Sequence, residues 1–333
     1  MTCLVDFEVT WTDGSEPRPD ADWIPAVVPG GVHESLLAAG LIEHPYAGQH
    51  EHELGWVHES TWWYRTTFPH PGVGAQTHLE FAGLDTVAEV RLNGAVVGTA
   101  RNQHRSHRFE VSGLFEATNE LLVRFPPPLE GLLTDDEVAA TIDDMRSRQT
   151  SVLRQVTDEE LTIRILRARL RKATFSWGWD FAPVVTSRGI SGPVSLTASR
   201  PELRDVLVRS IDLDVESRTA TLLVTGSSNG PVMVSVTSPS AEVLTATAEG
   251  DFEVRLLLRD IALWWPHDLG EPALYDVVVA SGGARTVVRH GIRTIEIDRS
   301  PDPEENAELF RFLVNGVPTF ARGANVVPGT MLV

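Results

Sequence analysis

The chain has one cysteine, one lysine and no long apolar run, and each of these scarcities narrows what it can be. With Cys3 alone, no disulfide can form within the chain, which is compatible with a reducing compartment. No run of 18 apolar residues occurs, and the N-terminal sequence MTCLVDFEVTW lacks the basic and apolar regions of a signal peptide. We therefore expect no membrane-spanning helix, no signal peptide and a cytoplasmic location.

Positive charge is also in short supply. The 333 residues include 46 Asp and Glu against 28 Lys and Arg, a formal net charge of -18, and Lys172 is the only lysine. Nucleic-acid phosphates and anionic lipids both bind through Lys and Arg, so this balance argues against nucleic-acid and membrane partners. A neutral ligand is neither attracted nor repelled by net charge, and the composition fits one.

Short apolar or alternating runs broken by Gly, Pro, Asn and Asp dominate the sequence. They include residues 77–81, 88–94, 119–125, 219–226, 232–237 and 275–280. Alternation with a period of two indicates strands of antiparallel sheets with one buried face. Asn93-Gly94 between two such runs predicts a hairpin, because both residues tolerate positive φ. The fold class is therefore mainly β.

Two stretches have helical patterns. Residues 31–41 predict a short helix, and apolar residues spaced along 134–170 predict a long one inserted in the first domain. Thr134 can cap the long helix, and the acidic residues after it suit the positive end of a helix dipole.

Two polar or Pro-containing segments predict domain boundaries, near Ala198–Pro201 and over Arg299–Asn306. Between them, strand-like runs recur at the spacing of an immunoglobulin-like sandwich. Residues 309–333 predict a hairpin followed by a single strand ending at Gly323-Ala324-Asn325, which is typical of the start of a further domain.

Several segments together resemble the β-mannosidase branch of glycoside hydrolase family 2. In the family's order they are Val28–His33, Trp62–Phe68, Phe81–Val87 with Leu92–Gly94, Arg171–Ala173 with Gly178–Asp180, Trp264–Pro266, Gly291–Thr294, and Val314–Pro318 with Gly323–Asn325. The resemblance implies a jelly-roll sugar-binding domain over 1–198 with a helical insertion near 130–170. An immunoglobulin-like sandwich would follow over 199–298, then the start of a (β/α)8 catalytic barrel over 299–333.

The resemblance implies an exo-acting retaining enzyme that removes terminal β-mannosyl residues without metal or cofactor. Retention needs two carboxyl groups about 5–5.5 Å apart, and in the family both stand on later barrel strands. We therefore expect no catalytic residue within 1–333, and Asn119-Glu120, which matches the acid/base dipeptide, is better explained as the start of a strand. A carbohydrate-binding or scaffold module, or a parent enzyme for another β-glycoside, is the alternative.

The resemblance places Asp180 and Trp179 on a loop that contacts the terminal mannose. A carboxylate among aromatic residues needs hydrogen-bond partners, and sugar hydroxyls can supply them. The alternative is that Trp177 and Trp179 are core residues and that Asp180 pairs with Arg171 or Lys172. Arg171 and Lys172 would either orient this loop or form an ordinary salt bridge.

Asn325, at the expected end of the first barrel strand, is a further sugar-contacting candidate, because barrel active sites form at such strand ends. Equally, it could cap the strand or the next turn. The segment Phe181-Ala182-Pro183 departs from the family's Trp-Gly-Pro and leaves the sugar preference open. Gly226–Gly230 matches a nucleophile elbow, but a strand follows where that motif needs a helix, so we predict a hairpin turn. The histidines of residues 50–58 have no established metal-ligand spacing.

Overall fold

The computed structural model describes residues 2–72, 77–148, 156–178, 183–197, 203–303, 307–326, 329–330 and 332. Two compact units divide the chain, one formed mainly by residues 1–200 and one by residues 201–326. Among the described residues, no helix is long and apolar enough to cross a membrane.

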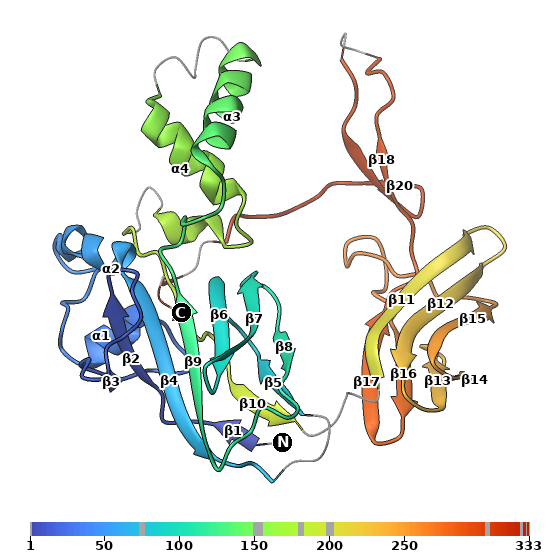
Figure 1. Cartoon of the computed structure of the whole chain (residues 1–333). Coiled ribbons are helices and arrows are strands. Elements are labelled where there is room, and N and C mark those ends of the chain that lie inside the picture. Colours follow the sequence, from blue (N-terminus) through green and yellow to red (C-terminus); the bar gives the residue numbers. More distant parts are fainter. Residues whose placement is uncertain are drawn as a thin grey trace. The chain divides into compact units, whose positions relative to one another are not determined.

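The first unit contains two antiparallel sheets (Figure 1). The smaller sheet has the order β1 (Thr2–Leu4), β10 (Val194–Thr197), β5 (His78–Phe81), β8 (His107–Glu110). The larger has the order β3 (Ile24–Pro25), β2 (Glu8–Thr12), β4 (Thr61–Pro69), β9 (Thr118–Phe125), β6 (Val87–Leu92), β7 (Ala95–Arg101). Apart from β2–β3 and β6–β7, the neighbours in each sheet come from distant parts of the sequence, as in the predicted jelly roll.

Alternation along the strands builds the core of this unit. In β9 the residues alternate between exposed or half-buried and buried, and Leu121, Val123 and Phe125 face inward. Trp62 and Tyr64 of β4 lie in the same cluster. The predicted hairpin is confirmed: Asn93 and Gly94 have φ of 51° and 81° between β6 and β7.

Short helical turns precede β4. The predicted helix within 31–41 is confirmed as α1 (Val32–Ala38), where the Glu34 carboxylate accepts a hydrogen bond from the Gly31 N–H at 3.0 Å. Next come a 3-10 turn, η1 (His50–Glu53), and α2 (Gly55–Glu59). A second 3-10 turn, η3 (Thr174–Trp177), lies late in the unit.

The single long helix expected over 134–170 is wrong. Two helices, α3 (Asp135–Arg148) and α4 (Asp158–Ala168), lie side by side instead (Figure 1). Thr134 caps α3 as predicted, accepting from the Glu137 N–H at 3.3 Å. The missed signal is Thr157, which caps α4 in a capping box with Glu160.

The second unit is a sandwich of two antiparallel sheets with its own core. One sheet has the order β11 (Leu203–Asp214), β12 (Thr219–Ser228), β15 (Asp251–Leu258). The other has the order β14 (Val243–Ala248), β13 (Val232–Thr237), β16 (Tyr275–Ser281), β17 (Ala284–His290). The segment Gly226–Gly230 is followed by a strand, as predicted, but it is no hairpin turn, because β12 and β13 belong to different sheets.

A three-stranded meander completes the second unit, formed by β18 (Ile295–Asp298), β19 (Arg311–Val314) and β20 (Val317–Thr319). Its predicted hairpin is confirmed, with positive φ at Asn315 and Gly316. The strand expected to end at Asn325 does not form, since 320–326 is neither helix nor strand. A strand needs hydrogen bonds to a neighbouring strand, and none of the described residues pairs with 320–326 in this way.

Candidate functional site

The loop predicted to contact sugar lies between two segments that the structure fixes in detail. Trp179 and Asp180 themselves fall outside the described residues, as do residues 181–182. Residues 171–178 lead into the loop and residues 183–190 lead out of it. The contacts of these two ends define the candidate site.

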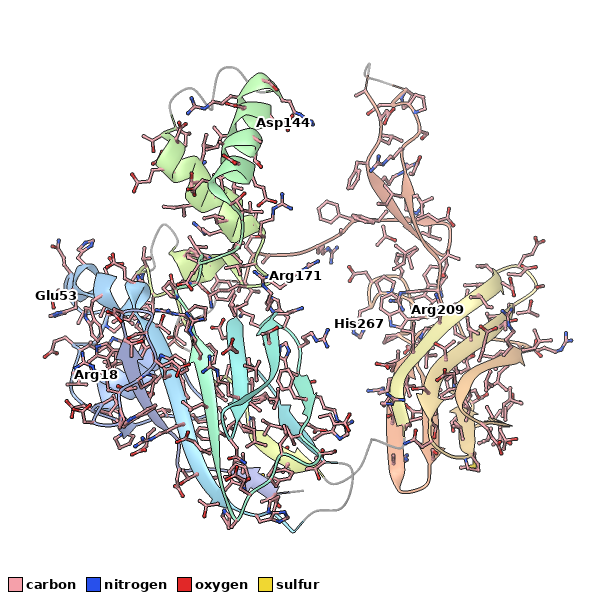
Figure 2. All side chains as sticks on the ribbon, in the orientation of Figure 1. Arg18, Glu53, Asp144, Arg171, Arg209 and His267 are labelled. Carbon is pink, nitrogen blue, oxygen red and sulfur yellow. The ribbon has the colours of Figure 1, made fainter. Side chains whose placement is uncertain are left out.

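The entering end is attached to the turn between β7 and β8. Arg171, labelled in Figure 2, is exposed, and its carbonyl accepts from the Gln103 N–H at 3.0 Å. The Gln103 side-chain carbonyl accepts in return from the Ala173 N–H at 3.1 Å. These two bonds hold the backbone on either side of Lys172, so its side chain has a defined direction.

Lys172 points into the protein and is fully engaged. Its side chain is 1% exposed and its ammonium donates to Asp85 Oδ1 at 2.5 Å. Ser187 accepts two further bonds, on its carbonyl at 2.8 Å and on Oγ at 3.0 Å. Burial lowers the pKa of Lys172, and the Asp85 carboxylate acts in the opposite direction. All three ammonium hydrogens are satisfied, so none is left for a sugar hydroxyl.

Asp85 joins both ends of the loop. Its Oδ2 accepts from Ser187 Oγ at 2.6 Å, and its Oδ1 also accepts from Thr86 Oγ1. Its backbone exchanges two hydrogen bonds of 2.9 Å with Gly189. A Cβ at Gly189 would lie 2.6 Å from the Gly30 carbonyl oxygen, so this close approach requires glycine.

Residues 183–190 are held mainly by the segment just before β4, and also by Pro126 directly after β9. The Glu51 carboxylate accepts from the Val184 N–H at 2.7 Å, and His58 Nε2 accepts from the Thr186 N–H at 3.4 Å. Arg188 is buried and donates to the carbonyls of Ser60 and Pro126, at 2.8 Å and 3.0 Å, and to that of Val57. Each of these bonds links residues more than 60 positions apart in the sequence.

Two histidines complete this buried polar region. Their rings lie 5.8 Å apart, and burial lowers the pKa of His33 to about 3 and that of His58 to about 4. The positive charge of Arg188 acts in the same direction on both. Neither ring nitrogen of His33 has a hydrogen-bond partner among the described residues. Both imidazoles are therefore neutral at pH 7.

Comparison with known proteins decides the family. Residues 7–192 match the family model described as glycosyl hydrolase 2 galactose-binding domain-like. The chain belongs to this family. A β-mannosidase B of Aspergillus terreus is 30% identical over 330 residues, covering 93% of this chain and 37% of the relative. The chain thus spans well under half the length of the curated relatives it matches.

Solved structures agree with the family assignment. A β-D-mannosidase from Dictyoglomus thermophilum matches 100% of this chain and 40% of its own length, with a TM-score of 0.73 and 27% identity. An exo-chitosanase from Amycolatopsis orientalis matches with a TM-score of 0.58 at 17% identity, which shows a shared fold alone. The match to the exo-chitosanase extends over 98% of this chain.

Two further positions were considered from the family resemblance, Asn325 as a sugar contact and Asn119-Glu120 as a match to the acid/base dipeptide. Asn325 belongs to the second unit, where it is exposed and outside any strand. Asn119 is buried in β9, and its side chain bonds to Asn93 and Glu116, which is a structural role. Within the described ranges, no group of three His, Cys, Asp or Glu side chains is arranged to hold a metal ion.

Sequence reasoning gave no role to Asp85, Ser187, Arg188, His33 or His58. Asp85 and His33 stand within segments that carry the family resemblance, but nothing in their local pattern distinguishes a buried charge from a surface one. One signal was available for Lys172. This residue lies in the Arg171–Ala173 segment that carries the family resemblance, and it is the chain's only lysine, which supplies a compact ammonium and not a guanidinium fork.

Proposed function

We propose that this chain is the N-terminal part of an exo-acting retaining β-mannosidase that hydrolyses terminal β-D-mannosyl residues of β-mannosides. The observation that carries the proposal is the match of the whole chain to the β-D-mannosidase of Dictyoglomus thermophilum at 27% identity. The β-mannosidase B relatives support the same substrate class, a neutral carbohydrate.

Within this function, Asp180 binds hydroxyls of the terminal mannose, and Trp179 packs against its C–H face. Arg171 and Lys172 support this subsite through the base of the loop, and Asn325 is a further proposed sugar contact, from the segment that would enter the barrel. The buried contacts of Lys172 support an orienting role for that residue, because an ammonium with three protein acceptors has no donor left for substrate.

The chain alone is proposed to be inactive. Retaining hydrolysis needs a nucleophile and an acid/base about 5–5.5 Å apart, and the resemblance assigns both to later barrel strands. The chain's match to only 37% of the Aspergillus terreus relative supports this division.

The test compares hydrolysis of a chromogenic β-mannoside by residues 1–333 and by the extended protein, in which the chain continues through the length of its relatives. Activity only in the extended protein is expected. Turnover by residues 1–333 that disappears in Asp180→Ala would overturn the division of labour. A folded extended protein that hydrolyses another β-glycoside but not mannosides would overturn the substrate assignment.

A further inference from the structure

We propose that Lys172, Asp85 and Ser187 form a buried clamp that closes the segment 173–186 and acts as a positioning device for the sugar-binding residues it carries. The inference deepens the proposed function and rests on it for the identity of the bound sugar. The clamp itself consists only of residues whose contacts the structure describes.

The contacts of the clamp join the two ends of the segment 173–186 at its base. Lys172 and Ser187 stand 15 positions apart, yet two hydrogen bonds from the Lys172 ammonium join them directly. Asp85 bonds to both side chains, at 2.5 Å and 2.6 Å. Fixing both ends lowers the number of conformations open to the residues between them, which is what a binding loop needs in order to hold a carboxylate in place.

Burial makes the clamp strong and selective. The side chains of Lys172 and Asp85 are 1% and 3% exposed, whereas those of the Arg65–Glu8 pair on the same unit are 31% and 45% exposed. In this dry setting each charge is costly without the other, so the pair stays closed. A guanidinium is expected to fit this place poorly, since its planar fork differs in shape from the compact ammonium that the three acceptors surround.

Asp85 also connects the clamp to the sheets. Its backbone pairs with Gly189, and the residues after it continue into β6. The base of the loop is therefore attached to the sheets of the jelly roll by main-chain hydrogen bonds, and not through another loop. Misplacement of a substrate-binding group by about 1 Å is enough to lower activity by about a hundredfold.

The first experiment measures amide hydrogen exchange in residues 1–333 without any sugar. Lys172→Met is expected to accelerate exchange of the amides of 173–178 and 184–187 by about tenfold or more, while amides of β9 keep their rates. Lys172→Arg is expected to behave like Lys172→Met. The matched control is Arg65→Met, which breaks the half-exposed pair with Glu8 and should leave the loop unchanged.

A double variant separates the clamp from the effect of an unpaired charge. Lys172→Met/Asp85→Leu removes both buried charges and is expected to fold, while the loop amides still exchange fast. Wild-type loop rates in the double variant would overturn the proposal. So would equal acceleration of β9 and the loop in Lys172→Met, because that pattern is one of general destabilisation.

The second experiment uses the extended protein and a β-mannoside. The double variant is expected to raise KM by about tenfold with kcat changed much less, because the loop still carries its binding groups but holds them less often in place. Asp180→Ala serves as the reference. If Asp180→Ala leaves KM unchanged, the sugar-binding role fails while the exchange result still judges the clamp. If Asp180→Ala raises KM and the double variant does not, the positioning role is overturned.

Discussion

At the scale of single residues, the buried His33 and the half-buried His58 couple stability to pH. The pKa of His58 falls from 6.5 in the unfolded chain to about 4 in the fold because burial disfavours its charged form. Between these values the unfolded chain binds a proton that the folded chain does not. The stabilising contribution of His58 is therefore complete above pH 6.5. As the pH falls to about 4, the free energy of unfolding decreases by roughly 2–4 kcal/mol for one such group.

The measurement is denaturant unfolding between pH 7.5 and pH 4, comparing wild type with His58→Gln. Glutamine can still accept from the Thr186 N–H but does not titrate, so the variant should lose less stability across this window. A variant with the wild-type pH slope would contradict the assignment to His58. His33, with a pKa of about 3, adds a second contribution of the same sign.

Single residues also show which contacts the sequence could predict and which it could not. Thr134 was predictable as a cap because a cap depends on neighbours three residues away. The pairing of Lys172 with Asp85 was not, because the two are 87 positions apart and the fold alone brings them together. The roles proposed for Asp180, Trp179 and Asn325 stay predictions.

At the scale of elements, the α3–α4 pair has a small core of its own. Four buried residues form it: Val138, Ile142, Leu161 and Ile165. Leu161 is 0% exposed, so Leu161→Ala removes a large share of this core and is expected to cost about 2–4 kcal/mol. Because the two helices have only this small core, they should unfold locally while the sheets remain folded.

Far-ultraviolet circular dichroism and amide hydrogen exchange together test this. The helical signal should fall in Leu161→Ala, while the slow exchange of the β4 and β9 amides stays unchanged. Ile163→Ala, at a position 40% exposed on the same helix, is the matched control and should keep its helical signal. Simultaneous loss of both signals in Leu161→Ala would show that the helices and sheets unfold as one.

Element prediction succeeded where the pattern was local. Asn93-Gly94 gave the hairpin, because the turn geometry is set by the two residues themselves. The single long helix failed at Thr157, whose capping role is visible in the sequence but competes with an uninterrupted apolar periodicity. The strand expected near Asn325 failed for a different reason, since strands exist only with partners.

At the scale of the whole molecule, the two sandwiches have separate cores with no residue in common. Leu222 of β12 is 0% exposed, and Leu222→Ala should cost the second unit about 2–5 kcal/mol. Calorimetry is expected to show two transitions, of which only one moves to lower temperature. Leu257→Ala, at a residue 54% exposed on the neighbouring strand, is the control. A single transition that shifts as a whole would contradict independent units.

The architecture was the most predictable feature of the molecule. Strand alternation and the segments resembling the family indicated a mainly β chain with two sandwiches, and the structure and family match confirm that fold class. The chemistry was less predictable, because the residues that anchor the loop carry no local signature of burial.

The solitary lysine also makes this protein unusual for chemical labelling. Reagents that acylate side-chain amines find only the 1% exposed ammonium of Lys172 in the folded chain. Acylation there requires the ammonium first to leave Asp85 and lose its proton. The rate at which a small amine-directed probe modifies Lys172 thus reports how often the structure opens locally around this single side chain.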